Sequence, residues 1–360
     1  MPQFPDGPKA LTAAWLNTIL REVGVLSNGT LTAVHLDVPD RTGILGTVVR
    51  CQLVADLEST STPNTLIAKF APLNPDMRRV LFEFGMSPAE VRFYQQLAHH
   101  SGVPTPHCYY AAIDPATGAF VLLLEDLIAA RLGSWLTGCT PDDAHDVVCA
   151  IAKLHATWWD SPRLATFDWL TVGVAKPVLS AITSAWQPFL ARVGESVPAP
   201  LIEIGRRLAL HIDDIDAQLV ARPLTLIHND LHLDNIFFDT SKRARSVNVI
   251  DWQFLAIGPG MKDIAFFLGG NLPSADRRAH EEAILRAYHT ALQDAGVVGY
   301  SFEQCIGDYR LALLDAWSRF IFSVGTYREP DDRLPFLINT ILPRFYAAIL
   351  DMQAGEYVPG

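Results

Sequence analysis

The chain has 360 residues, of which 49% are hydrophobic and 19% are charged, and this globular composition excludes intrinsic disorder. Its formal net charge of −11 argues against broad, sequence-independent binding to nucleic acid, which needs a positive surface. The length is sufficient for one large domain or for two lobes.

The cysteines and the apolar runs indicate where the protein acts. The five cysteines include no C-x-x-C pair, which favours reduced, structural thiols over a disulfide framework or a zinc ribbon. The first residues, MPQFPDGPKALTAAWLN, lack a basic start followed by an apolar core, so we expect no signal peptide. Apolar runs such as residues 119–124 are far shorter than the roughly 20 residues of a membrane span. We therefore expect a cytoplasmic protein that does not enter a membrane.

The first third of the chain predicts a sheet accompanied by helices. Apolar residues recur at helical spacing over residues 12–24, which predicts an amphipathic helix. Residues 87–100 begin as a capping-box helix, with Ser87 as N-cap and Pro88 at the first helical position. Strands are predicted at residues 48–57 and 65–71, and in a hairpin that ends near Asp126.

After residue 127 the pattern becomes mainly helical. Strand signals are confined to the segments around residues 225–228, 235–239 and 246–251. The sequence therefore predicts an α+β protein whose first 127 residues carry the sheet and whose residues 128–360 form a helical body. The predicted helices of that body cover residues 141–159, 179–192, 201–219, 275–295, 302–324 and 334–354.

The stretch LTLIHNDLHLDNIFFD, residues 224–239, concentrates polar side chains between two apolar runs. In a metal cage, alternating His228, Asp230, His232 and Asp234 would share one face of a strand and suit Zn²⁺ or Fe²⁺. In a phosphotransfer loop, His228, Asp230 and Asn235 have the spacing H-x-D-x-x-x-x-N, where the Asp accepts the hydroxyl proton and the Asn holds Mg²⁺. A third interpretation is a polar turn without chemistry.

The flanking residues predict a hairpin that bears on this choice. NIFFD and SVNVID enclose the polar turn TSKRAR. Asn235 and Asp251 are equidistant from residue 243, so a regular hairpin would place them opposite each other, roughly 5 Å apart at Cα. An amide and a carboxylate in that position can share one Mg²⁺ ion, which gives Asp251 a role that the zinc interpretation lacks.

HNDLHLDN followed by VIDWQ resembles the aminoglycoside phosphotransferase and choline kinase superfamily. GILGTVVR, EVRFYQQLA, FVLLLEDL and AKLHATWW are most similar to its ecdysteroid-kinase-like branch, and the resemblance runs from about residue 30 to residue 330. It implies a two-lobed, protein-kinase-like fold. Residues 1–127 would form an antiparallel-sheet, nucleotide-binding lobe with one key helix. Residues 128–360 would form a mainly helical lobe with the catalytic loop and the acceptor site.

The resemblance assigns roles to three residues of the central segment. Asp230 matches the catalytic aspartate, which orients or deprotonates the attacking hydroxyl. Asn235 and Asp251 match the two magnesium ligands, and Asp251 stands in DWQ where protein kinases have D-F-G. His228 is expected to hold the loop by a hydrogen bond, while His232 and Asp234 receive no role.

Roles in nucleotide binding follow for residues of the first lobe. Lys69 in LIAK resembles the lysine that neutralises the α- and β-phosphates of ATP. Its expected partner is Glu90 in EVRFYQQLA, with Glu83 in reserve, although the local pattern makes Glu90 a capping-box residue. The glycines of TGILG, Gly43 and Gly46, would bring backbone N–H groups to phosphate oxygens, but a plain hairpin explains them almost as well.

Three further expectations concern the hinge and the lower lobe. Backbone groups from Glu125 to Leu127 are expected to meet the adenine ring. Asp263 in GPGMKDIAFFL is expected to cap its helix and to brace the catalytic loop. His155 is expected to be a core residue of the helical lobe.

The sequence therefore predicts an ATP- and Mg²⁺-dependent phosphotransferase that acts on a hydroxyl of a small molecule. The acceptor is an apolar or steroid-like alcohol or an antibiotic-type compound, and no nucleic acid or membrane partner is expected. The alternatives are a metal-dependent hydrolase that uses the His and Asp cluster, and a nucleotide-binding protein without catalysis. Candidate walls of the acceptor site, whose helical spacing also suits a core, are Trp186, Asp315, Trp317, Phe320 and Tyr327.

Overall fold

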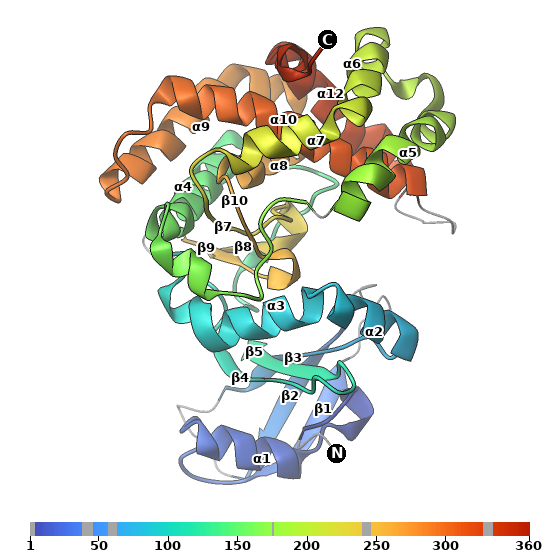
Figure 1. Cartoon of the computed structure of the whole chain (residues 1–360). Helices are drawn as coiled ribbons and strands as arrows, with labels where there is room; N and C mark the ends of the chain where they lie inside the picture. The colour runs from blue at the N-terminus through green and yellow to red at the C-terminus, as the bar shows by residue number, and fades with distance from the viewer. Residues whose placement is uncertain (1–3, 38–45, 57–62, 175, 240–245, 327–333) are drawn as a thin grey trace. The chain divides into compact units, whose positions relative to one another are not determined.

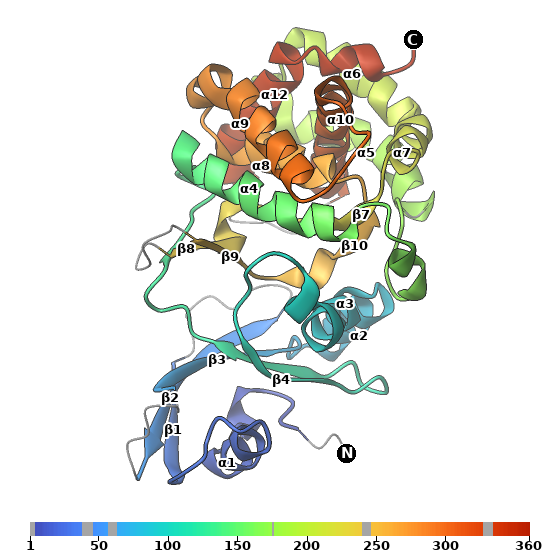
Figure 2. The same ribbon diagram turned by 90° about the vertical axis from the view of Figure 1, so that its left-hand side faces the viewer.

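The computed structural model describes residues 4–37, 46–56, 63–174, 176–239, 246–326 and 334–360. The chain forms two compact units, each of which contains a short segment from the other part of the sequence (Figures 1 and 2). Unit 1 comprises Met1–His100, Thr105–Ala129 and Ile250–Phe254, and unit 2 comprises Ser101–Pro104, Ala130–Val249 and Leu255–Gly360. The segment that carries Asp251 thus belongs to unit 1, although its place in the sequence suggested the helical lobe.

Unit 1 is built on a five-stranded antiparallel sheet with the strand order β1-β2-β3-β5-β4. On β3, Leu66, Ala68 and Phe70 are buried, while the alternating Lys69 faces the other side, as a period of two requires. Helices α1 and α3 lie on opposite sides of this sheet (Figure 1). The strands are β1 (Leu31–Asp37), β2 (Thr47–Ala55), β3 (Thr65–Phe70), β4 (Cys108–Ile113) and β5 (Phe120–Glu125).

The helices of unit 1 start at identifiable capping residues. Helix α1 (Ala13–Glu22) begins after Thr12, whose hydroxyl accepts a hydrogen bond from the backbone N–H of Trp15. Its apolar face packs on the sheet core through Leu16 and Leu20. Helix α2 (Pro75–Glu83) was not predicted, although Asn74 before Pro75 is a start signal that the sequence contains.

The predicted capping box at Ser87 is wrong. Helix α3 (Met86–Arg92) begins two residues earlier than predicted, and its N-cap is Gly85 with a φ of 75°. Glycine reaches this left-handed conformation at no steric cost, so one residue can end α2 and start α3. Ser87 is consequently buried within the helix, and Glu90 is not needed as a cap. The chain continues as a π-helical turn (Phe93–Leu97) and a 3₁₀ turn (Ala98–His100).

Unit 2 is mainly helical, as predicted. Helix α8 is buried along its whole length, and α10 packs against both α8 and α5. The helix predicted at 201–219 is two helices, because His211 leaves helical geometry with a φ of −111° and a ψ of 25°. Among the helices of the described ranges, none is both long and apolar enough to cross a membrane. The helices are α4 (Pro141–Trp158), α5 (Lys176–Val193), α6 (Ala199–Leu210), α7 (Ile212–Val220), α8 (Met261–Asn271), α9 (Ser274–Asp294), α10 (Phe302–Thr326), α11 (Leu334–Phe336) and α12 (Leu342–Asp351).

Two small sheets hold the central loop of unit 2. Strand β7 (Thr225–Ile227) pairs with β10 (Ala256–Gly258), and β8 (Ile236–Asp239) pairs with both β6 (Arg131–Leu132) and β9 (Ser246–Val249). The polar loop of residues 228–235 therefore leaves one sheet and enters the other. Such a loop is anchored at both ends by backbone hydrogen bonds.

The predicted hairpin is present, but its register differs from the prediction by one residue. Ile236 pairs with Val249, so the same register would align Asn235 with Ile250 and not with Asp251. Asn235 also ends a 3₁₀ turn (Leu233–Asn235) and lies outside the ladder. Residues 240–245, predicted as the turn, lie outside the described residues.

Candidate active site

Lys69 is the centre of a buried cluster of charges in unit 1. Its ammonium lies 2.7 Å from Glu90 Oε2 and 2.8 Å from Asp251 Oδ1. The predicted pair with Glu90 is confirmed, and the reserve candidate Glu83 is exposed at the end of α2. Glu90 reaches Lys69 because α3 covers the side of the sheet to which β3 directs its lysine.

Asp251 is held beside Lys69 by an unusual backbone and by its neighbours. Its φ is 67°, a left-handed conformation that costs a non-glycine residue of order 1 kcal/mol. The next residue, Trp252, stacks on Phe93 with a centroid distance of 3.9 Å and an interplanar angle of 12°. Gln253 Nε2 donates to the second carboxylate oxygen of Asp251 over 3.3 Å. The bond between Asp251 and Lys69 was not foreseen from the sequence.

The charges of this cluster do not balance. Burial raises the pKa of Glu90, because it disfavours the charged carboxylate. The Lys69 ammonium lowers this pKa and the Asp251 carboxylate raises it, so the pKa stays above its ordinary value. Burial alone would lower the pKa of Lys69, but the two carboxylates outweigh it and raise that pKa above its ordinary value. Two carboxylates around one ammonium favour the binding of a further cation. Asp251, with 26% of its side chain exposed, is the carboxylate that such a cation can reach.

The other predicted nucleotide-binding residues are only partly described. Gly46 approaches β3 so closely that a Cβ there would lie 3.0 Å from the carbonyl oxygen of Phe70. Gly43 lies outside the described residues. The backbone N–H of Glu125 already donates to the carbonyl oxygen of His107 over 2.8 Å, and Leu127 follows in the connection after β5. Contact of residues 125–127 with adenine therefore stays a prediction, with the N–H of Glu125 already engaged.

In unit 2, the carboxylate of Asp263 holds the backbone of the polar loop. Its two carboxylate oxygens accept hydrogen bonds from the backbone N–H groups of His228 and Asn229, each over 2.7 Å. His155 Nε2 lies 3.2 Å from the same carboxylate, and both side chains are fully buried. The predicted brace and the core position of His155 are confirmed. The predicted helix cap is wrong, because Gly260 is the N-cap of α8 and the Asp263 carboxylate points to the loop.

The carboxylate of Asp230 is ionised although it is largely buried. Burial by itself raises its pKa, but His232, Arg319 and His228 together lower the pKa to about 2. His228, fully buried, accepts a hydrogen bond from the backbone N–H of Asp230 at its Nδ1 over 3.3 Å, which confirms its predicted role in holding the loop. At neutral pH Asp230 is therefore a carboxylate that can accept a proton or a hydrogen bond.

His232 and Asp234, which received no role from the sequence, connect the loop to Trp135. The His232 ring stacks on Trp135 with a centroid distance of 4.5 Å, and its Nε2 lies 3.5 Å from Asp230 Oδ2. Asp234 Oδ1 accepts a hydrogen bond from the backbone N–H of Trp135 over 2.8 Å. No local pattern in the sequence indicates these contacts, because Trp135 is about a hundred residues away from its partners.

Asn235 presents its amide oxygen as a possible metal ligand. Its Nδ2 group donates to the carbonyl oxygen of Asp230 over 3.0 Å and lies 3.2 Å from His232 Nε2. Because a carbonyl oxygen only accepts hydrogen bonds, this contact fixes the amide and directs Oδ1 elsewhere. An amide oxygen and the Asp251 carboxylate are hard ligands that fit Mg²⁺. The two residues belong to different units, so their sharing of one ion stays a prediction.

The metal-cage interpretation of the loop is wrong. Within the described ranges, no group of three His, Cys, Asp or Glu side chains could hold a metal ion. The loop is not a strand, and its side chains diverge: His228 is buried against its own backbone, while Asp234 faces Trp135.

The sequence model of one family, described as "Phosphotransferase enzyme family", matches residues 59–298, which is more than half of the chain. The chain belongs to the phosphotransferase enzyme family. This finding agrees with the resemblance to aminoglycoside phosphotransferases and choline kinases, and with a fold that has an antiparallel-sheet unit and a helical unit.

Solved structures share the fold of this phosphotransferase. A protein from Ralstonia eutropha assigned as an aminoglycoside phosphotransferase aligns with a TM-score of 0.55 at 16% identity, covering 96% of this chain and 98% of its own. An ethanolamine kinase from Plasmodium vivax aligns with a TM-score of 0.54 at 11% identity, covering 98% of this chain and 92% of its own. At such identities the likeness concerns the fold alone.

Curated relatives match a smaller part of the phosphotransferase. Acyl-CoA dehydrogenase family member 11 from Pongo abelii is 27% identical over 172 residues, and the human protein of that name is 26% identical over 172 residues. Each alignment covers 46% of this chain and 21% of the relative, so the chain spans about a fifth of their length. The family therefore rests on the family model, and the ecdysteroid-kinase-like branch stays a prediction.

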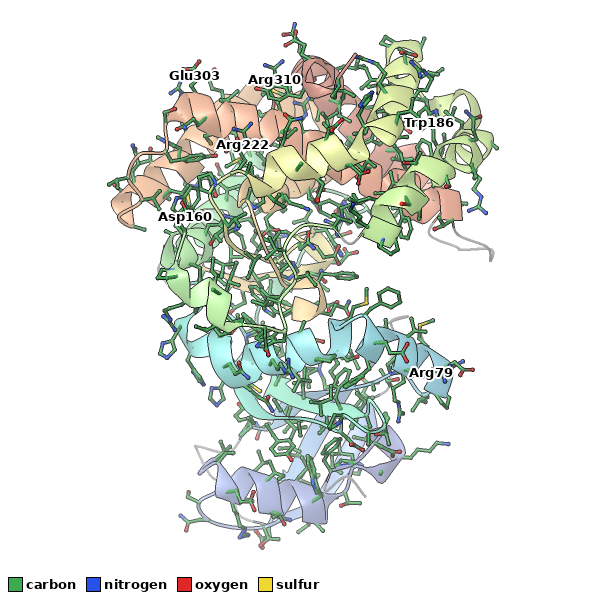
Figure 3. The ribbon with its side chains drawn as sticks, viewed as in Figure 1. Arg79, Asp160, Trp186, Arg222, Glu303 and Arg310 are labelled. Carbon is green, nitrogen blue, oxygen red and sulfur yellow. The ribbon has the colours of Figure 1, made fainter. Side chains whose placement is uncertain are left out.

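Most of the predicted acceptor walls of the phosphotransferase are core residues. Trp186, labelled on α5 in Figure 3, and Trp317 on α10 are 4% and 0% exposed and meet edge to face. Asp315 forms a buried ion pair with Lys262 at 3.1 Å. Phe320 joins an aromatic cluster near the loop, and Tyr327 lies outside the described residues.

Proposed function

We propose that this phosphotransferase is a kinase that uses ATP and Mg²⁺ to phosphorylate a hydroxyl group of a small molecule. The observation that carries the proposal is the loop around Asp230. A largely buried carboxylate with a pKa of about 2 lies next to Asn235, whose amide is turned so that its oxygen is left for a metal. Phosphoryl transfer needs this combination of an ionised carboxylate, which accepts the hydrogen bond of the hydroxyl, and a metal ligand.

Lys69 and its two carboxylates would bind the nucleotide. The ammonium group neutralises phosphate charge, and Glu90 on α3 fixes its direction. A bound Mg²⁺ would supply positive charge against the negative charge that develops during transfer. Asp251 and Asn235 are the residues that would hold it, and the unbalanced charge around Lys69 supports this role for Asp251.

Asp230 would orient the attacking hydroxyl. A carboxylate with such a low pKa is a weak base, so it accepts a hydrogen bond from the alcohol and takes the proton only as the new P–O bond makes that proton acidic. The brace from Asp263 and the His228 contact hold the loop in place while this happens.

The aromatic cluster supports an apolar alcohol as the acceptor. Trp135 stacks on the His232 ring, which lies beside Asp230, and extends this contact to other rings. Trp135 and Phe336 are partly exposed, so a bound molecule can contact them. Such a surface suits a steroid- or terpenoid-like alcohol better than a polycationic antibiotic, which needs dense acidic charge. The further rings around Trp135 are Phe266, Phe320 and Phe336, at centroid distances of 5.9, 6.4 and 6.0 Å.

An acceptor screen tests this proposal. ADP release from Mg-ATP would be measured with geraniol, menthol, cholesterol, benzyl alcohol, choline, ethanolamine and kanamycin. We expect an apolar alcohol to stimulate release and Asp230→Asn to abolish the stimulation. A response to kanamycin or choline alone would overturn the acceptor class. Binding of Mg-ATP in a thermal-shift assay without ADP release for any acceptor would favour a non-catalytic nucleotide-binding protein.

The proposed kinase would act in the cytoplasm. All five cysteines are free thiols, which is consistent with a reducing compartment that also supplies ATP.

A further inference from the structure

The peptide unit between Asn229 and Asp230 is held at both of its polar groups. Its carbonyl oxygen, that of Asn229, accepts a hydrogen bond from Arg319 Nη2 over 2.5 Å. Its N–H, that of Asp230, donates to His228 Nδ1 over 3.3 Å. Because this peptide carries the Cα of Asp230, its orientation decides where the catalytic carboxylate points.

Asn229 adopts a conformation that needs such support. Its φ is 63°, in the left-handed region that a non-glycine residue occupies at a cost of order 1 kcal/mol. The backbone N–H of Asn229 is bound by Asp263, and its side-chain oxygen lies 3.5 Å from Arg319 Nη1. Asp263 thus holds Asn229 from one side and Arg319 from the other.

Arg319 is presented by a rigid frame. It lies on α10, one turn after Asp315, and Asp315 forms a buried ion pair with Lys262 of α8 at 3.1 Å. The neighbour of Lys262 is Asp263, so the same two helices supply both groups that grip Asn229. The Arg319 guanidinium also lies 4.8 Å from the ring centroid of Phe266 on α8, where a cation–π contact stabilises its position.

We propose that Arg319 is a positioning residue for phosphoryl transfer, which fixes the Asn229–Asp230 peptide and keeps positive charge near the Asp230 carboxylate. The inference rests on the proposed function of Asp230. It predicts that loss of Arg319 lowers kcat and leaves nucleotide affinity unchanged, because the charges that would bind nucleotide in unit 1 do not include Arg319.

Arg310 offers a matched control on the same helix, about 13 Å earlier at the rise of an α-helix (Figure 3). Its Nη2 donates to the carbonyl oxygen of Gln353 over 2.8 Å, and Gln353 is left-handed with a φ of 52°. The guanidinium lies 5.0 Å from the ring centroid of Tyr357. Arg310 therefore holds the carbonyl oxygen of a left-handed residue in a C-terminal turn, as Arg319 holds that of Asn229 in the catalytic loop.

The experiment compares Arg319→Met with Arg310→Met in the full chain. ADP release from Mg-ATP is measured with the most active alcohol of the panel above, together with KM for ATP and the unfolding temperature. We expect Arg319→Met to lower kcat on the order of 10²-fold with KM for ATP unchanged within about 2-fold. Arg310→Met should lower the unfolding temperature and leave kcat within about 2-fold. Equal effects of the two variants on kcat, or no effect of Arg319→Met, would overturn the proposal.

Two further variants separate positioning from folding. If Arg319→Met does not fold, Arg319→Lys keeps the charge and one donor, and a loss of kcat of about 10-fold is expected. Asn229→Gly removes the left-handed strain, so Arg319→Met should cost less in that background than in the wild type. Equal costs in both backgrounds would contradict a positioning role. A wild-type protein that releases no ADP with any acceptor contradicts the proposed function instead.

Discussion

The pKa values of two carboxylates, one in each unit, are shifted in opposite directions. Burial raises the pKa of both, yet Glu90 in unit 1 ends above its ordinary value and Asp230 in unit 2 ends at about 2. The difference lies in the groups that surround each carboxylate. Glu90 shares the Lys69 ammonium with Asp251, whereas His232, Arg319 and His228 all act on Asp230 and outweigh the effect of its burial.

This contrast separates binding from chemistry. The cluster in unit 1 has an excess of negative charge, so it gains from a divalent cation and can use the lysine for phosphates. In the loop of unit 2, His232, Arg319 and His228 lower the pKa of Asp230, so its carboxylate stays ionised at the point where a hydroxyl would react.

Removal of the Asp230 charge should give the largest effect. Asp230→Asn retains the shape of the side chain but not its charge, so we expect kcat to fall at least about 10³-fold. Affinity for Mg-ATP, measured by calorimetry, should stay within a few fold, because Lys69, Glu90 and Asp251 are untouched. Full turnover by this variant would show that Asp230 does not perform the chemistry.

Removal of Lys69 should affect binding and stability instead. Lys69→Met leaves Glu90, 2% exposed, and Asp251 without a cation, and loss of one partner from a buried pair costs about 3 kcal/mol. We expect at least a 10-fold weaker affinity for Mg-ATP and a lower free energy of unfolding at pH 7. The double variant Lys69→Met/Glu90→Gln serves as the control and should recover part of the stability. Unchanged nucleotide affinity would remove Lys69 from the site.

Weakening the brace should give an intermediate effect. In the wild type, each oxygen of Asp263 accepts a hydrogen bond from one backbone N–H group. Asp263→Asn retains only one oxygen, so one N–H group loses its partner, which should lower the free energy of unfolding by about 2 kcal/mol. Because the loop becomes looser, kcat should fall about 10-fold. Urea unfolding and steady-state kinetics measure the two quantities. A loss of stability with an unchanged kcat would show that the loop holds Asp230 without this brace.

The pH dependence of stability should be the smallest effect and should have opposite signs in the two units. For Asp230 the folded pKa is depressed, so its stabilisation is present above pH 3.8 and is lost as the pH falls towards 2. For Glu90 the folded pKa is raised, so stability falls as the pH rises above its ordinary value of 4.5. Unfolding of Glu90→Gln at several pH values should lack this second decline. The same decline in the wild type and the variant would contradict the shift of Glu90.

The kinetic pH profile follows from the same assignment. Asp230 is ionised throughout the usual assay range, so kcat should show no acid limb from this residue above about pH 4. An acid limb near neutral pH that shifts in Asp230→Glu would indicate that the pKa of Asp230 is not depressed.

The sequence was most informative where chemistry and local pattern coincide. The spacing of His228, Asp230 and Asn235 indicated the loop, and the family resemblance of LIAK indicated Lys69 at the end of a β-rich run. The pairing of Lys69 with Glu90 was predicted from the family resemblance, although the capping box suggested another use for Glu90. The structure resolves that conflict through Gly85, whose left-handed backbone starts the helix two residues earlier than predicted.

Long-range contacts could not be predicted in this way. Arg319 and Trp135 reach the loop from positions 90 and 99 residues from their partners Asn229 and Asp234, and no local pattern announces such contacts. The hairpin register was wrong by one residue, because its centre lies in a turn whose length the pattern does not fix. The metal cage failed because it assumed a strand where the chain forms a loop and a 3₁₀ turn.

In the proposed reaction the γ-phosphoryl group moves from ATP to an alcohol. This transfer can be followed by ³¹P NMR of the wild-type protein with ATP, MgCl₂ and an apolar alcohol. We predict one new phosphomonoester resonance that grows in equal amount with ADP and does not appear when EDTA is present. Formation of inorganic phosphate alone, or product formation that persists with EDTA, would contradict the account.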